Sequence, residues 1–153
     1  MQLPASISIE NQGKNQLILV DNQYAKAQVS LFGAQVISFI PKSDNRDRMW
    51  LSPLTFTDGR ETIRGGSPVC WPWFANQFPN QDESLPAHGF VRSQLWELQL
   101  AEETYSGTRL VLHCPKTRDK GFEYSANLTL EVLVGKKLTI SLQTQNTDQN
   151  PFS

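Results

Sequence analysis

The stretch "SANLTLEVLVGKKLTISLQTQN", residues 125–146, decides the fold class. Apolar side chains occupy every second position of its first half, which is typical of a strand with one buried face. These positions are Ala126, Leu128, Leu130, Val132 and Val134. A turn at "GKK" then reverses the chain, and Leu138, Ile140 and Leu142 repeat the alternation. The pattern predicts an antiparallel hairpin.

The same period of two recurs along most of the chain. It is found in "QLILV" (16–20), "AQVSLFGAQVISFIP" (27–41), "LWELQL" (95–100) and "RLVLHC" (109–114). Gly33 is a candidate bend or bulge, and in 95–100 we expect Trp96, Leu98 and Leu100 to point inward. About seven to nine short strands separated by turns predict an all-β fold, an antiparallel β-sandwich forming one domain over residues 1–153.

Charge and composition exclude several classes of partner. The 153 residues carry 14 Lys and Arg against 15 Asp and Glu, a net charge of −1, so no bulk attraction to nucleic acid or to an anionic membrane is expected. No signal-peptide pattern and no long apolar run is present. Cys70 and Cys114 are expected to be free thiols. We therefore expect a cytoplasmic protein.

Residues 42–94 lack the alternation, apart from the short run "RMWLS" (48–52). A loop of this length inside a compact domain is usually functional. It contains Arg64 in "IRGG", and His88 and Arg92 in "HGFVR". The guanidinium fork is the preferred partner of phosphate. The alternative is that both arginines are ordinary surface residues and that the histidine is structural.

The run "VCWPWF" (69–74) also has two interpretations. Trp71 and Trp73 should point to the same side of an extended segment. They form either a hydrophobic plug under the loops or an aromatic wall for a sugar ring.

The remaining polar candidates are weaker. His113 alternates with Arg109 and Val111, so we expect it to face solvent, and Asp82 and Glu83 are expected at a solvated loop tip. No spacing of metal ligands and no phosphate-binding glycine loop occurs, so neither a metal nor a cofactor is expected.

Two motifs carry a family resemblance. "TIRGGSPVCWPWF" (62–74), followed by "LPAHGFVR" (85–92) and then Trp96, closely resembles the hexose-6-phosphate mutarotases (glucose-6-phosphate 1-epimerases) of the aldose 1-epimerase superfamily. The similarity extends more loosely from "LILVDN" (17–22) to "NTDQNPFS" (146–153). At Ala75 the chain departs from its relatives, which usually carry glycine there.

The resemblance implies a galactose mutarotase-like supersandwich about twice as long as this chain, which would be its N-terminal half. It implies an isomerase that interconverts the α and β anomers of a hexose 6-phosphate. Arg64 and Arg92 would bind the 6-phosphate, Trp73 would contact the sugar, and His88 would be an auxiliary catalytic residue near C1. The principal acid, a His in an "LHTYF"-like strand, and the base, a Glu, would lie beyond Ser153, so the chain alone is expected to be inactive.

Two alternatives remain at this point. The chain could be a non-catalytic module that binds a sugar phosphate through the same loops. It could also be a truncated sandwich that associates with another copy through its exposed strand edges.

Overall fold

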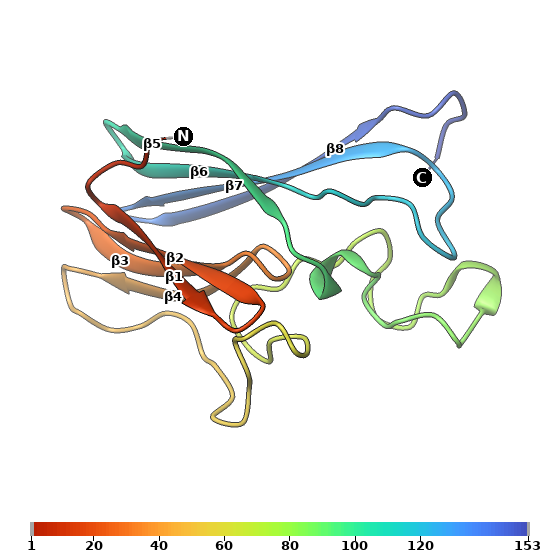
Figure 1. The fold of residues 1–153 in the computed structure, drawn as a ribbon, viewed down its shortest axis with the longest axis horizontal. Helices are drawn as coiled ribbons and strands as arrows, with labels where there is room; N and C mark the ends of the chain where they lie inside the picture. Colours follow the sequence, from red (N-terminus) through yellow and green to blue (C-terminus); the bar gives the residue numbers. More distant parts are fainter. Residues whose placement is uncertain (1, 153) are drawn as a thin grey trace.

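The computed structural model describes residues 2–152, which form two four-stranded antiparallel sheets packed face to face (Figure 1). The first sheet contains β1 (Ile7–Gln12), β2 (Asn15–Asp21), β3 (Ala25–Ser30) and β4 (Gln35–Pro41). The second contains β5 (Glu97–Thr104), β6 (Gly107–His113), β7 (Ala126–Gly135) and β8 (Leu138–Asn146). In each sheet, strands that follow one another in the chain are hydrogen-bonded neighbours. The predicted all-β sandwich is confirmed.

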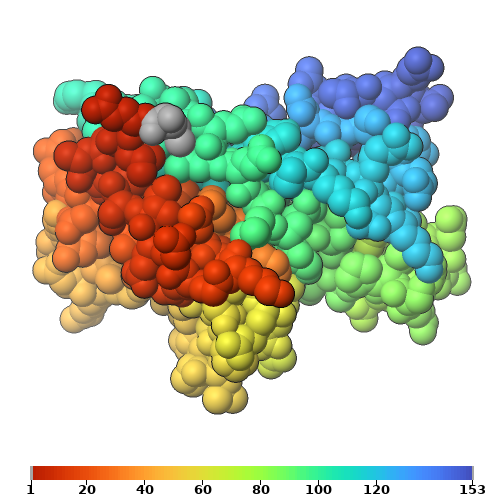
Figure 2. All heavy atoms as spheres, viewed as in Figure 1, coloured from red at the N-terminus to blue at the C-terminus, as the bar shows by residue number. Residues whose placement is uncertain are grey.

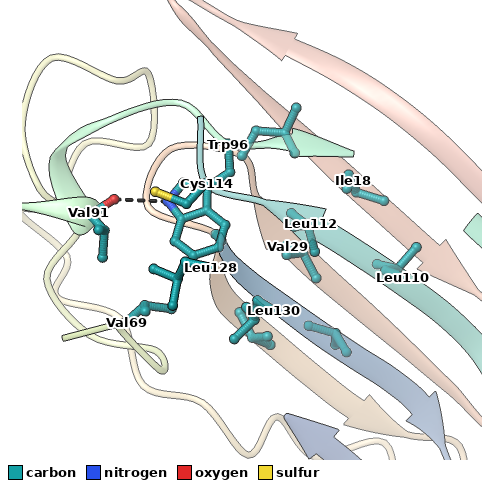
Figure 3. Packing of buried hydrophobic residues seen from close by; sticks show 14 of the residues in the cluster. Ile18, Val29, Val69, Val91, Trp96, Leu110, Leu112, Cys114, Leu128 and Leu130 are labelled. Carbon is teal, nitrogen blue, oxygen red and sulfur yellow. Dashed lines mark hydrogen bonds between the residues drawn. The ribbon is translucent and has the colours of Figure 1, made fainter. Parts of the chain in front are cut away.

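Alternate side chains of the central strands form the core between the sheets (Figure 3). Among the most deeply buried are Ile18, Val29, Leu110, Leu112, Leu128 and Val132. Each such side chain contributes about 1.5–3 kcal/mol relative to an exposed position. The hairpin of residues 125–146 supplies β7 and β8 in the expected register, with Val132 opposite Ile140. Leu142 is nevertheless 43% exposed, because β8 is the edge strand of its sheet.

The region around Gly33 is a turn between two strands. The chain reverses there, which agrees with the candidate bend at Gly33, and residues 27–41 supply most of the hairpin of β3 and β4. Gly33 has a φ of +77°, and a Cβ at this position would lie 2.8 Å from the carbonyl oxygen of Arg92. This glycine therefore lets the turn pack directly on the segment that carries Arg92.

A bulge in β5 overturns one predicted orientation. Leu98 lies opposite Leu112, but the register then shifts and Leu100 lies opposite Val111. Ala101, 6% exposed, takes the inward position instead of Leu100. The prediction that Leu100 points inward is wrong, because the one extra residue of a bulge moves every following side chain to the other face.

Two further features differ from the sequence analysis. Strand β1 was not predicted: its alternation is limited to Ile7 and Ile9, and of these only Ile7 is buried, because β1 is an edge strand. His113 lies on the outward face of β6 with Arg109 and Val111, as expected, but it is half-buried there. Its Nε2 lies 3.4 Å from the Asn127 Oδ1, and its Nδ1 is enclosed without a partner among residues 2–152.

Helical structure within residues 2–152 amounts to two 3-10 turns, η1 (Pro79–Gln81) and η2 (Val91–Ser93). Neither approaches the length and apolarity that crossing a membrane requires, and the described residues contain no other helix that could.

The two cysteines are free, as predicted, and differ in their surroundings: Cys114 is buried and Cys70 is half-buried. Burial raises the pKa of the Cys114 thiol to about 11. Because the thiolate is the reactive form, we expect Ellman's reagent at about pH 8 to modify Cys70 but not Cys114 in the folded chain. Both should react after unfolding in guanidinium chloride. Two rapidly reacting thiols in the folded chain would contradict this assignment.

Candidate functional site

The long segment between β4 and β5 is irregular but anchored to the sandwich. Its first part protrudes as a lobe (yellow in Figure 2). Isolated bridges join Val36 to Ser67 and Leu51 to Gly65, and the Ser67 N–H donates to the Val36 carbonyl at 2.8 Å. The segment therefore covers part of the edge of β4.

Arg64 is exposed, and its backbone is held on both sides. Its N–H donates to the Thr55 Oγ1 at 2.8 Å, and its carbonyl accepts from the Ser52 N–H at 2.9 Å. Gly65 follows with a φ of +115°, where a Cβ would lie 2.2 Å from the Trp50 carbonyl oxygen. Within residues 2–152 the Arg64 guanidinium makes no hydrogen bond or ion pair. It is therefore available to an anion.

Arg92 lies in η2, which contacts within the core hold in place. The Trp96 Nε1–H donates to the Val91 carbonyl at 2.9 Å (Figure 3), and the Gly33 N–H donates to the Gln94 carbonyl at 2.8 Å. The Arg92 side chain is half-buried, and its Nε is enclosed without a hydrogen-bond partner in the described part of the chain. The terminal nitrogens of the guanidinium also have no partner there but are not enclosed, so they are the donors that an anion could reach.

Trp71 and Trp73 combine the two expected interpretations. Each is 8% exposed, and each packs against Phe90 with ring centroids 6.0 Å apart. Both also line a hollow of about 460 Å³. Its other lining residues include Pro79, Asn80, Phe122, Tyr124 and Phe152. The tryptophans are therefore both part of the core and the wall of a pocket of ligand size.

The segments around Trp73 and His88 are joined by several hydrogen bonds. The Trp73 Nε1–H donates to the Pro86 carbonyl at 2.9 Å. The Ala75 N–H donates to the His88 Nδ1 at 3.0 Å, and the His88 N–H donates back to the Ala75 carbonyl at 2.9 Å. The Phe90 N–H donates to the Trp71 carbonyl at 3.2 Å. The tertiary structure thus brings two of the four candidate residues together.

The placement of Arg64 is different. The Arg64 backbone is bonded to Ser52 and Thr55. Arg92 lies instead in η2, which ends directly before Gln94, whose carbonyl accepts from Gly33. Convergence of the two arginines on one phosphate therefore stays a prediction.

The loop tip is tied down more firmly than expected. The Asp82 carboxylate lies 2.9 Å from the Lys120 Nζ. Hydrogen bonds from Ser84 and Lys120 lower the pKa of Asp82 to about 2. This contact connects the loop to the segment before β7, which also carries Phe122 and Tyr124. The sequence analysis missed these two aromatic residues because they lie far from Trp71 in the chain, where no local pattern connects them.

Arg64, His88 and Arg92 are not among the residues that line the hollow beside Trp71 and Trp73, so only their chemistry bears on a ligand. Arginine forks bind phosphate oxygens, aromatic walls accept the apolar face of a ring, and a neutral histidine donates one hydrogen bond. Among residues 2–152, no three His, Cys, Asp or Glu side chains lie close enough together to hold a metal ion.

Comparisons with known proteins agree with this description. Residues 16–153 match the family model for aldose 1-epimerase. The chain is 36% identical over 129 residues to the "putative glucose-6-phosphate 1-epimerase" of Escherichia coli (strain K12). That match covers 83% of this chain and 42% of the relative, so the chain spans less than half of the relative's length.

Solved structures show the same fold. The crystal structure of a "putative mutarotase" from Salmonella typhimurium matches with a TM-score of 0.83 and 32% identity, covering 94% of this chain and 48% of that one. A galactose mutarotase-like protein from Lactobacillus casei ATCC 334 shares the fold alone, with a TM-score of 0.56, 20% identity, and coverage of 88% and 45%. With a family match over most of its length and a described fold of the same type, the chain belongs to the aldose 1-epimerase family.

Proposed function

We propose that the protein interconverts the α and β anomers of a hexose 6-phosphate, as a glucose-6-phosphate 1-epimerase does, and that this chain supplies the residues that bind the phosphate and the sugar. The observation that carries the proposal is the half-buried Arg92 guanidinium, which makes no hydrogen bond or ion pair within residues 2–152 and whose terminal nitrogens, unlike its Nε, are not enclosed. A phosphate oxygen would accept from these terminal nitrogens, while a neutral sugar would leave the positive charge unpaired. The printed name of the Escherichia coli relative supports the same substrate.

In the proposed reaction a base removes the proton of the C1 hydroxyl and an acid protonates the ring oxygen. The ring opens, the C1–C2 bond rotates, and the aldehyde recloses on its other face. Arg64 and Arg92 would hold the phosphate, Trp73 would contact the sugar, and His88 would donate a hydrogen bond to an oxygen near C1. Each acid or base typically contributes about 10²–10⁴ in rate.

We expect the principal acid and base in the part of the relatives' length that this chain does not span, since the chain covers 42% of the Escherichia coli relative. The isolated chain should therefore show negligible turnover, measured by exchange NMR between the anomers of glucose 6-phosphate. A rate near that of a full-length relative assayed in parallel would contradict this proposal.

Binding tests the phosphate assignment directly. Arg92→Ala should weaken the binding of glucose 6-phosphate about 10- to 100-fold, because a hydrogen bond to a charged group contributes about 1.5–3 kcal/mol. Isothermal titration calorimetry would measure the change. Arg60→Ala is the control, since Arg60 is exposed and paired with Asp58 in the protruding lobe. Equal affinity of the unsubstituted chain for glucose and its 6-phosphate would refute the proposed arginine site.

A second candidate function is non-catalytic binding of a sugar phosphate. It is favoured by the fact that all four candidate residues for binding lie within this chain. It predicts the same loss of affinity in Arg92→Ala. It also predicts that the protein binds the sugar phosphate without interconverting its anomers, even when the catalytic acid and base of the relatives are supplied. Under either proposal we place the protein in the cytoplasm, in keeping with two unpaired cysteines. Pairing between copies would use the open edge of β8, and sedimentation at several concentrations would detect it.

A further inference from the structure

We infer that the main-chain N–H of Ala75 fixes the tautomer of His88, so that His88 offers a hydrogen-bond donor at Nε2 and cannot act there as a base. Only the role of this donor toward a sugar oxygen rests on the proposed function. The tautomer itself follows from contacts within the described residues.

The central contact is the hydrogen bond from the Ala75 N–H to the His88 Nδ1, 3.0 Å long. A nitrogen that accepts a hydrogen bond carries no proton. A neutral imidazole has one proton, so that proton must be on Nε2. A main-chain N–H can only donate, so it cannot pair with a His88 Nδ1 that carries a proton. A hydroxyl, which both donates and accepts, could pair with either tautomer. Ala75 is in this sense a positioning residue, and it acts through its backbone.

The surrounding backbone keeps this contact in place. The His88 N–H donates back to the Ala75 carbonyl at 2.9 Å, so two hydrogen bonds join the same pair of residues. Ala75 and His88 have φ values of +50° and +67°, a conformation that side chains other than glycine rarely adopt. The bridge between Trp71 and Gly89 closes the pairing directly after His88. Several independent contacts thus hold two unusual backbone conformations.

The imidazole ring is also oriented from the side. The Phe74 ring packs on it in a T-shaped contact, with centroids 5.0 Å apart and an interplanar angle of 70°. Phe74 is 61% exposed, so this contact lies at the surface of the site.

The remaining ring nitrogen is the one that can meet a ligand. The His88 Nε2 has no hydrogen-bond partner among residues 2–152. Two unpaired side-chain atoms of the described residues are enclosed, the Arg92 Nε and the His113 Nδ1, and the His88 Nε2 is not one of them. Its N–H is therefore unpaired and not enclosed by the chain. Because this nitrogen already carries a proton, His88 polarises an oxygen by donating to it, and proton removal from the C1 hydroxyl needs another group.

Long-range ¹H–¹⁵N NMR of the ¹⁵N-labelled chain tests the tautomer. The chain has two histidines, so one His113→Gln variant assigns both imidazoles. At about pH 8.5, where imidazole is neutral, His88 should show a bare Nδ1 and a protonated Nε2. A protonated Nδ1, or the averaged signals of a free imidazole, would overturn the inference.

Two variants test the role of Ala75 separately from folding. His88→Asn keeps an acceptor near the position of Nδ1 and tolerates a positive φ, whereas His88→Ala has no acceptor. In His88→Ala the Ala75 amide should exchange with solvent about tenfold faster, and in His88→Asn the change should be smaller. The Phe90 amide, which donates to the Trp71 carbonyl, is the internal reference and should stay unchanged. Equal acceleration of the Ala75 amide in both variants would contradict the role of Nδ1.

Addition of glucose 6-phosphate separates this inference from the proposed function. If both hold, the His88 Nε2 resonance should shift while Nδ1 remains bare. If the tautomer is as inferred but the ligand leaves Nε2 unchanged, the tautomer stands and the proposed substrate contact fails.

Discussion

Gly89→Ala is expected to destabilise the chain by about 2–5 kcal/mol, which is the sum of about 1–2 for a left-handed alanine and about 1–3 for overpacking. Gly89 has a φ of +72°, and a Cβ there would lie 1.9 Å from the carbonyl oxygen of Trp71 and 2.9 Å from the Pro72 nitrogen. These are backbone atoms, and moving them would break the hydrogen bond from the Phe90 N–H to the Trp71 carbonyl.

Urea unfolding followed by tryptophan fluorescence would measure this loss. Gly59→Ala is a matched control, since Gly59 has a φ of +80° but its added Cβ would meet nothing closer than 3.4 Å. It should cost only the backbone term, about 1–2 kcal/mol. If both variants lose the same stability, the close approach of Gly89 to Trp71 is not what requires glycine.

Trp96→Ala is expected to destabilise the chain by about 3–5 kcal/mol, the usual range for removing a buried aromatic side chain. Trp96 is 2% exposed and packs in the core between the sheets (Figure 3). Its Nε1–H satisfies the Val91 carbonyl at 2.9 Å, and its backbone N–H donates to the Leu31 carbonyl at 2.8 Å. The substitution leaves a cavity and an unpaired carbonyl next to Arg92.

Trp96→Phe separates the two effects. Phenylalanine retains much of the apolar surface but lacks the Nε1–H donor. The packing loss should therefore be smaller than in Trp96→Ala, and the unpaired Val91 carbonyl should lower the free energy of unfolding by about 1–2 kcal/mol more. Urea unfolding gives the stability, and calorimetry under conditions where both proteins are folded gives the affinity for glucose 6-phosphate. Weaker binding by folded Trp96→Phe is expected, because η2 would lose one of its anchors. Unchanged stability in Trp96→Ala would show that the Trp96 ring does not support the core.

The strand predictions succeeded where burial alternates along the chain. The residues of β7 face alternately inward and outward, and the sequence shows this directly because apolar and polar residues alternate along the strand. Strand β1 gives a weaker signal, because its alternation stops after Ile7 and Ile9, and Ile9 is 38% exposed at the edge of the sheet. Leu100 fails for another reason: the bulge before it depends on pairing with β6, which the local sequence of β5 does not encode.

The candidate site divides in the same way. The motifs around Arg64, Trp73, His88 and Arg92 could be found from residue types and spacing, because glycines, prolines and aromatic residues constrain the local backbone. Their surroundings could not. The contact of Trp71 with Phe122, at a centroid distance of 4.8 Å, joins residues from distant parts of the chain.

By itself, then, the sequence determined the all-β class, most strands and the four candidate residues, since each of these depends on short-range patterns of polarity and backbone freedom. Tertiary structure alone decided which polar atoms lose water. It enclosed the Arg92 Nε without a partner and set the Ala75 N–H against the His88 Nδ1. Desolvation and hydrogen-bond direction depend on groups that no local sequence pattern relates, such as Ala75 and His88, which are 13 residues apart within the long segment and meet only in its folded form.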